Sequence, residues 1–175
     1  MKLTEHSKLH VVVEEGGVSV MTLSSTDQWQ ALMDLAYDKW QGTGWNYRQF
    51  LLNLDAIERK AVILGNFHYQ TTNGGLQQWV DNGYASGGGV DLLTILEEMN
   101  TETSRRVLGI VRSVLENVDL GQEKRGFGGD YWLESWVDDE PPSWMEEIEE
   151  LTDEYYSLYD GFVVDVEGYL TGLTG

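Results

Sequence analysis

The chain has 175 residues, of which 41% are hydrophobic, so it can bury a core and is not expected to be wholly disordered. Thirty acids against eleven bases give a formal net charge of −19, which argues against direct binding to nucleic acids or anionic membranes because both are polyanions. There are no cysteines, which excludes a disulfide framework and a thiolate metal site.

The sequence carries no sign of export or of a membrane anchor. No apolar run approaches the roughly 20 residues that a membrane-spanning helix needs. The N-terminal sequence MKLTEHSKLH lacks the charged and then apolar pattern of a signal peptide. We therefore expect a cytoplasmic protein.

The first predicted element is a small N-terminal β-hairpin. Two β-rich runs, residues 11–13 and 18–23, flank the sequence EEGG at residues 14–17. Glycine reaches the positive φ that a tight hairpin turn needs. An isolated hairpin is marginally stable and must pack on something. We expect residues 1–24 to form this extension and residues 25–175 to form a helical domain.

Residues 25–40 are predicted to form the first helix. Ser25 and Gln28 have the spacing of a capping box, which starts a helix. Apolar residues then recur at intervals of three and four, the pattern of a helix with one buried stripe. The expected stripe consists of Trp29, Leu32, Met33, Ala36, Tyr37 and Trp40. Gly42 and Gly44 end the helix.

A second helical segment is predicted from about residue 47 to residue 69, with a break near residues 53–55. Asn-Gly-Gly follows at residues 73–75 and is a strong turn signal. A short amphipathic piece, LQQWVDN, comes next, and the stretch GYASGGG at residues 83–89 is then predicted to be a flexible connector.

A further pair of helices is predicted at residues 90–100 and 101–118. Asn100 or Thr101 can cap the second one. A locally basic patch on this second helix consists of Arg105, Arg106 and Arg112. The expected fold class is therefore mostly α: a compact multi-helix domain with a small N-terminal β-hairpin. Residues 126–140 are expected to form an ordered loop, because their large aromatic side chains favour burial.

The negative charge is concentrated at the carboxyl end of the chain. Residues 1–125 hold 16 acids and all 11 bases, whereas residues 126–175 hold 14 acids and no base. Proteins adapted to high salt usually spread their acids over the whole surface, so this concentration argues against salt adaptation.

Residues 143–161 are predicted to form an amphipathic helix with Ser143 as its N-cap. At 100° per residue, an apolar stripe lies opposite a wholly anionic face. The stripe consists of Trp144, Ile148, Leu151, Tyr155, Leu158 and Tyr159, and the face consists of Glu146, Glu149, Glu150, Asp153 and Asp160.

This anionic face lacks the Glu–Lys pairs that usually stabilise surface helices. Each like-charge pair four residues apart is expected to cost about 0.2–0.5 kcal/mol. The acids Asp138, Asp139 and Glu140 upstream, and Asp165 and Glu167 downstream, extend the same negative field. From charge alone, a solvated face that aids solubility and a binding surface for cations or a basic protein remain equally open.

No motif of an enzyme or of a metal site stands out. His6, His10 and His68 do not form a helical metal pair, and His68 is expected to be a half-buried helix residue. A nucleophile elbow, a phosphate loop, a dinucleotide fingerprint and a calcium loop are all missing from the sequence. We therefore expect no catalytic residues, no cofactor and no bound metal.

Residues 66–84, NFHYQTTNGGLQQWVDNGY, resemble the DNA-mimic protein (DMP) family of small acidic helical proteins. The shared pattern is a helix, Asn-Gly-Gly, an apolar residue, Gln, an aromatic residue and Asn. It falls here on Asn73, Gly74, Gly75, Leu76, Gln78, Trp79 and Asn82. The resemblance extends over roughly residues 50–170, and the hairpin is not part of the pattern. The resemblance implies a structural role for the motif, with the two glycines permitting a tight corner and Asn73 acting as a cap.

The resemblance also implies a protein decoy whose acids imitate phosphates and occupy the site of a basic DNA- or RNA-binding protein. The target would be a transcription factor, a nucleoid protein or a bacterial defence nuclease. The last would make the chain an anti-defence inhibitor carried by a phage or mobile element. The expected partner-binding residues are Asp138, Asp139, Glu140, Glu146, Glu149, Glu150, Asp153 and Asp160, with Trp136 as an aromatic anchor.

Two other classes of protein share this acidity and size. One is an immunity protein that neutralises a basic toxin, and the other is an acidic structural protein without a cationic partner. Exposed aromatic residues are compatible with a homodimer in any of these cases.

Overall fold

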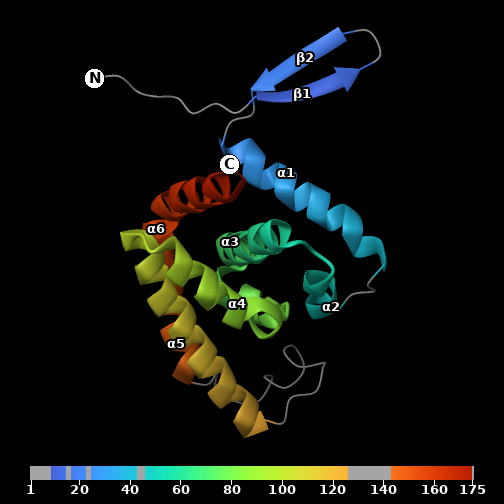
Figure 1. The fold of residues 1–175 in the computed structure, drawn as a ribbon. Helices are drawn as coiled ribbons and strands as arrows, with labels where there is room; N and C mark the ends of the chain where they lie inside the picture. The colour runs from blue at the N-terminus through green and yellow to red at the C-terminus, as the bar shows by residue number, and fades with distance from the viewer. Residues whose placement is uncertain (1–8, 15–16, 23–24, 43–45, 126–142, 175) are drawn as a thin grey trace, which may run out of the picture.

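The computed structural model describes the backbone of residues 9–14, 17–22, 25–42, 46–125 and 143–174, and the side chains of residues 28–40, 46–117 and 146–174. Its elements in chain order are the strands β1 (Leu9–Glu14) and β2 (Gly17–Thr22), helix α1 (Ser25–Asp38), the 3-10 helix η1 (Lys39–Gly42), and the helices α2 (Tyr47–Leu52), α3 (Ala56–Asp81), α4 (Tyr84–Met99), α5 (Glu102–Arg125) and α6 (Ser143–Thr174) (Figure 1). These α-helices confirm the mostly α fold class.

Strands β1 and β2 pair in an antiparallel arrangement, with Leu9 opposite Thr22 and Glu14 opposite Gly17. Residues 15–16 and the side chains of both strands lie outside the described residues. The turn of the expected hairpin and its packing therefore stay predictions. The division of the chain at residue 24 stays one as well, because residues 23–24 also lie outside the description.

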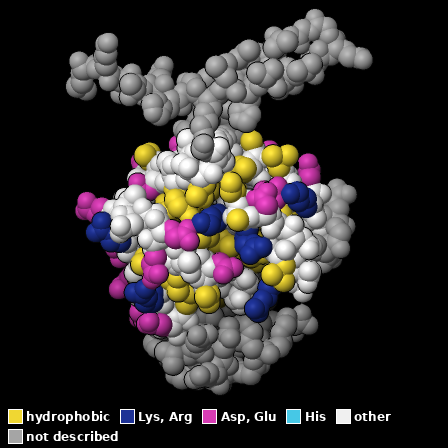
Figure 2. All heavy atoms as spheres, in the orientation of Figure 1, with side chains coloured by type: hydrophobic (Ala, Val, Ile, Leu, Met, Phe, Trp, Pro, Cys, Tyr) yellow, Lys and Arg dark blue, Asp and Glu magenta, His cyan; other side chains and the backbone are white. Residues whose placement is uncertain are grey.

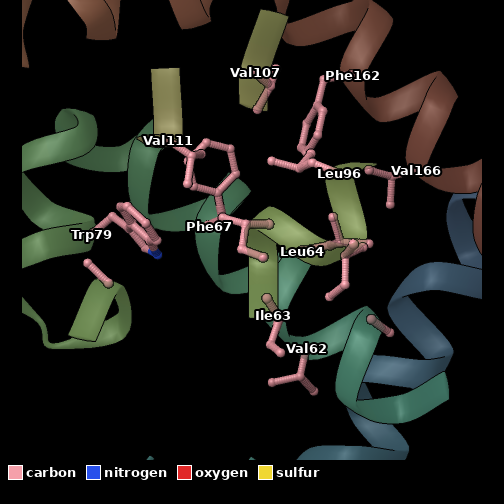
Figure 3. Packing of buried hydrophobic residues seen from close by; sticks show 14 of the residues in the cluster. Val62, Ile63, Leu64, Phe67, Trp79, Leu96, Val107, Val111, Phe162 and Val166 are labelled. Atoms are coloured by element: carbon pink, nitrogen blue, oxygen red, sulfur yellow. The ribbon is translucent and has the colours of Figure 1, made fainter. Parts of the chain in front are cut away.

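Helix α3 lies at the centre of the helical domain. Helices α1, α4 and α6 pack against it, and α5 packs against α4 and α6 (Figure 1). Residues 61–68 of α3 are all buried, which is expected for a helix covered on several sides. Figure 3 shows side chains from α3, α4, α5 and α6 converging around Phe67. The ring of Phe67 contacts those of Trp79 and Phe162 at centroid distances of 5.3 and 5.8 Å.

The predicted stripe of the first helix is confirmed. Trp29, Met33 and Ala36 of α1 are buried, and the half-buried members Leu32, Tyr37 and Trp40 pack against the same core. The indole Nε1 of Trp29 donates a hydrogen bond to the carbonyl of Ala61 at 3.1 Å. This contact joins α1 to α3.

The predicted break near residues 53–55 is also confirmed, and α3 begins with a capping box after it. The Asp55 carboxylate accepts hydrogen bonds from the N–H groups of Ile57 and Glu58, both at 2.9 Å. The Glu58 carboxylate accepts one in return from the Asp55 N–H at 3.1 Å. These bonds satisfy N–H groups that a helix start otherwise leaves unpaired.

The predicted turn at Asn-Gly-Gly is a corner inside α3. Gly74 and Gly75 have non-helical backbone angles, and Gly75 has φ +73° and ψ 179°. Only glycine adopts this conformation without strain. The chain turns here and resumes as a helix at Leu76.

The expectation of a flexible connector at residues 83–89 is wrong, because residues 84–89 form the first turns of α4. Tight packing explains the glycines. A Cβ atom on Gly87 would lie 2.7 Å from the ring of Tyr47, and one on Gly89 would lie 2.7 Å from a methyl group of Leu115. The missing side chains let α4 approach α2 and α5 closely.

None of the helices, within the residues that the structure describes, is both long and apolar enough to span a bilayer.

Candidate partner-binding surface

Helix α6 presents one face to the core and the opposite face to solvent. Its inward face carries the buried side chains of Ile148, Tyr155, Leu158, Phe162, Val166 and Leu170. These residues pack mainly against α3 and α5, with α1 covering the end of the helix. The Gln28 side chain of α1 donates a hydrogen bond to the Thr174 hydroxyl at 2.9 Å, which joins the last turn of α6 to α1.

The outward face of α6 is rich in negative charge. Every member of the predicted anionic face is exposed, and we call this set the acidic face: Glu146, Glu149, Glu150, Asp153 and Asp160. The set runs from Glu146 to Asp160, a distance of about 21 Å along the helix axis at about 1.5 Å per residue. Within the described part of the chain, none of these five carboxylates takes part in an ion pair.

Two arginines of α5 pair with carboxylates outside the acidic face. Arg106 of α5 pairs with Glu154 at 3.0 Å, at the edge of the acidic face. Arg112, also on α5, pairs with Glu97 of α4 at 3.3 Å. Neither Arg106 nor Arg112 therefore pairs with a carboxylate of the acidic face.

The sequence led us to expect that the acidic field extends to Asp165. In the structure it does not. Asp165 is half-buried, and its carboxylate accepts a hydrogen bond from the hydroxyl of Thr101 at the start of α5. A carboxylate is favoured there by the positive end of the helix dipole. Glu167 is half-buried too. Both residues belong to the packing of α6 against its neighbours.

The Asn-Gly-Gly corner positions α6. The N–H of Leu76, directly after the corner, donates a hydrogen bond to the hydroxyl of Thr152 at 3.1 Å. The Thr152 hydroxyl itself donates to the carbonyl of Ile148 at 2.8 Å. A Cβ atom on Gly75 would lie only 3.2 Å from the Thr152 methyl group. The glycine thus lets α6 approach α3 closely at the level of the acidic face.

The other residues of the motif form a polar network beside the corner. The side-chain amides of Gln78 and Asn82 both donate to the Gln70 side chain, at 2.8 and 2.7 Å. Trp79 is buried against the core. The Asn73 side chain is exposed and makes no hydrogen bond to the described residues, so the expected cap is provided by Thr152 instead.

Four expected partner-binding residues lie outside the described residues. They are Trp136, Asp138, Asp139 and Glu140. Ser143 begins α6, but its side chain also lies outside the description, as does that of Trp144.

Two tyrosines beside the acidic face were not expected there. Helical periodicity places Tyr159 in the buried stripe, yet its side chain is 41% exposed, and Tyr156 is 45% exposed. The Tyr156 hydroxyl donates to the carbonyl of Thr71 at 3.0 Å, and the Tyr159 ring stacks on His68 at 5.4 Å. One feature of the sequence could have indicated this exposure, because both tyrosines lie close to Asp153 or Asp160 along the helix. Whether they are buried, however, depends on how much of α6 is covered by α3.

His68 is buried rather than half-buried, and it lies behind this surface. Its Nδ1 atom is 2.8 Å from the hydroxyl of Tyr155. Burial lowers the pKa of His68 to about 4, because a charged imidazolium loses its hydration in the core. The ring is therefore neutral at neutral pH and acts as a core residue. The described residues contain no cluster of His, Asp or Glu able to hold a metal ion.

Comparison with protein families matches residues 52–171 to the DMP19-like protein family. This match confirms the resemblance seen in the sequence, and it includes both the Asn-Gly-Gly corner and the acidic face. Searches of curated proteins and of solved structures found no match. Because the matched range exceeds half of the chain, the protein belongs to the DMP19-like protein family.

Proposed function

We propose that this chain is a non-enzymatic DNA mimic whose acidic face occupies the DNA-binding groove of a basic protein. The observation that carries the proposal is the row of five exposed carboxylates on α6 that no described cation neutralises. Membership of the DMP19-like family supports the same function.

The charge density of the acidic face supports mimicry. The five carboxylates of the acidic face along about 21 Å of helix axis give an average of one charge per about 5 Å. One strand of DNA carries one phosphate per about 3.4 Å of axis. A site that binds phosphates with Arg and Lys therefore meets a comparable density of negative charge on α6. Long-range attraction speeds the encounter, and salt weakens it.

The acids Asp138, Asp139 and Glu140 lie directly before α6 in the chain and would extend the same negative surface. Trp136 would supply an apolar anchor, because charge alone seldom provides the desolvated contacts that dominate binding energy. The target in this proposal is a transcription factor, a nucleoid protein or a bacterial defence nuclease. A phage or mobile-element origin and an anti-defence role go with the last of these.

Removal of charge from the acidic face tests the proposal. The test variant changes Glu146, Glu149 and Glu150 to Gln and Asp153 to Asn. The matched control removes four exposed carboxylates outside α6, through Asp34→Asn, Asp38→Asn, Glu102→Gln and Glu116→Gln. Both variants lose the same net charge. We expect the first to lose affinity for the captured partner at least tenfold more than the second, with unchanged circular dichroism.

Capture from a cell lysate at low salt, followed by mass spectrometry, identifies the partner. DNA should displace the chain from that partner, because both occupy one groove. A ternary complex of chain, partner and DNA would contradict mimicry. A basic toxin as the captured partner would indicate an immunity protein instead. Equal binding by the test and control variants would remove the acidic face from the interface.

A further inference from the structure

A cleft of about 420 Å³ lies between α2 and α4, away from the acidic face. Its lining comes from α2, the start of α3 and residues 86–91 of α4, and includes no residue of α6. Ligand pockets in proteins commonly have volumes of about 300–1,000 Å³. The cleft is thus large enough to hold part of a ligand.

One basic residue of the cleft, Arg48, differs in its contacts from the other described basic residues. Most of the other described bases pair with a glutamate: Lys39, Lys60, Arg106 and Arg112. Arg59 donates to the carbonyls of Leu51 and Leu54, and Arg105 donates to that of Asn100. Arg48 lines the cleft, is exposed, and has no hydrogen bond or ion pair to any described residue. Acids are in large excess in the sequence, yet no described carboxylate pairs with this guanidinium, which leaves it available to an external anion.

Two of the most exposed aliphatic side chains of the described surface lie in the same cleft. Leu52 of α2 is 63% exposed and Val90 of α4 is 76% exposed. Gly87, Gly88 and Gly89 also line the cleft. Asp91 completes the lining with a carboxylate. Exposed apolar groups beside a few polar groups are typical of a binding site.

The cleft continues along the seam between α3 and α4. A second hollow of about 180 Å³ shares Arg59 and Asp91 with the first and adds Lys60 and Thr94. Together the two hollows contain three bases (Arg48, Arg59 and Lys60) and two acids (Asp91 and Glu98), in a chain whose net charge is −19. Figure 2 shows one face of the molecule, where Lys and Arg side chains lie among hydrophobic ones near the centre.

We propose that the α2–α4 cleft binds a short extended peptide segment that carries carboxylate and aliphatic side chains. The guanidinium of Arg48 binds a carboxylate of the peptide, and Leu52 and Val90 cover its aliphatic groups. Asp91 accepts a hydrogen bond from a peptide N–H. The elongated path past Arg59 favours an extended chain over a compact molecule. This proposal goes beyond the proposed function, since it does not depend on the acidic face.

Fluorescence anisotropy with a labelled peptide of Glu, Val, Ser and Gly tests the proposal. A salt concentration of about 0.15 M shortens the Debye length to about 8 Å, so that remote acids of the protein are screened. The counterpart peptide with Gln in place of Glu should bind at least about tenfold more weakly, because charge-assisted hydrogen bonds are lost. Arg48→Gln should weaken binding of the acidic peptide by a similar factor.

Two further variants separate the cleft from general effects. Val90→Asp places a charge in the cleft at an exposed position and should also weaken binding. Arg105→Gln removes an exposed arginine of α5 outside the cleft and should leave binding unchanged. The four-site amide variant of α6 should still bind the acidic peptide, whatever its effect on the DNA-binding partner. Circular dichroism checks that each variant is folded.

Several outcomes would overturn the proposal. They are the absence of peptide binding, equal binding of the Gln peptide, and binding that survives both Arg48→Gln and Val90→Asp. Competition by free glutamate or inorganic phosphate as strong as by the peptide would indicate a small-anion site. A change in self-association on Arg48→Gln, measured by sedimentation without peptide, would indicate that a second copy of the chain covers the cleft.

Discussion

The Thr152 hydroxyl of α6 and the Leu76 N–H of α3 form a hydrogen bond of 3.1 Å between residues that are 76 positions apart in the chain. Leu76 follows the non-helical residues Gly74 and Gly75, so its N–H has lost the usual partner inside the helix. A side chain of α6 replaces that partner. The corner in α3 and the position of the acidic face are thus joined by a single buried contact.

Thr152→Val should destabilise the fold by about 1–3 kcal/mol, because it leaves the buried Leu76 N–H without an acceptor. Valine keeps the shape and the β-branching of threonine, so helix propensity changes little. Urea unfolding measures the effect. Ser157→Ala is the control, since this exposed serine of α6 bonds only the nearby Glu154 carbonyl, and it should change stability by less than about 0.5 kcal/mol. Equal effects would mean that the contact is unimportant.

Gly75→Ala should destabilise the fold by about 1–3 kcal/mol, because the backbone at φ +73° and ψ 179° strains any residue with a Cβ atom. The added methyl group would also press on Thr152. Gly168→Ala in α6 is the matched control. Its Cβ atom meets nothing within 4 Å, so the change should stabilise the helix by about 0.5–1 kcal/mol. Thermal unfolding of the two variants should therefore shift in opposite directions.

Local sequence patterns account for what could be predicted. Asp55 and Glu58 start a helix through contacts three residues apart, and Gly74 with Gly75 ends one by backbone conformation alone. The outward direction of the acidic face follows from helical periodicity, which needs no knowledge of neighbouring elements. These features depend on residues close together in the chain.

Features that depend on packing between distant elements could not be predicted. The glycines at residues 87–89 have low helix propensity, yet they form part of a helix here. Their lack of side chains allows the helix to pack closely against Tyr47 and Leu115. The helical direction of Tyr159 suggested burial, but α3 covers it only in part through His68. The Thr152–Leu76 bond, and the lack of a partner for Arg48 among the described residues, likewise become visible only when the helices are assembled.

Gly87→Ala should test the close packing of α4. Alanine normally stabilises a helix by about 1 kcal/mol relative to glycine. Here the new methyl group would lie 2.7 Å from a ring atom of Tyr47, so we expect a net loss of about 1–3 kcal/mol. Gly109→Ala in α5 meets nothing within 4 Å and should gain stability. A gain at both positions, measured by thermal unfolding, would contradict the packing role of Gly87.

His68 should make stability depend on pH below neutrality. Its pKa is about 4 in the folded chain and about 6.5 when unfolded, so the folded state disfavours the proton. The stability it contributes is complete above pH 6.5 and is lost as the pH falls towards 4. Between pH 7 and pH 5 the loss should be about 2 kcal/mol. His68→Gln should flatten this part of the pH profile in urea unfolding, and an unchanged slope would contradict the assignment.

Glu150→Gln should change stability and partner binding in opposite directions. Glu150 lies four residues after Glu146, and Glu154 on its other side is already paired with Arg106, so neutralising Glu150 removes one uncompensated repulsive pair at this spacing. We expect a gain of about 0.2–0.5 kcal/mol in the free energy of unfolding at low salt. The gain should vanish in about 1 M salt, where the Debye length is about 3 Å.

Glu116→Gln on α5 is the control for this change, because Glu116 has Arg112 four residues before it and gains nothing by losing its charge. Affinity for the captured DNA-binding partner should fall for Glu150→Gln and stay constant for Glu116→Gln. A decoy surface must keep the repulsion between its own carboxylates, since the same negative charges attract the basic target. A merely solvated face has no such need, so a variant that gains stability without losing affinity would favour the solubility role.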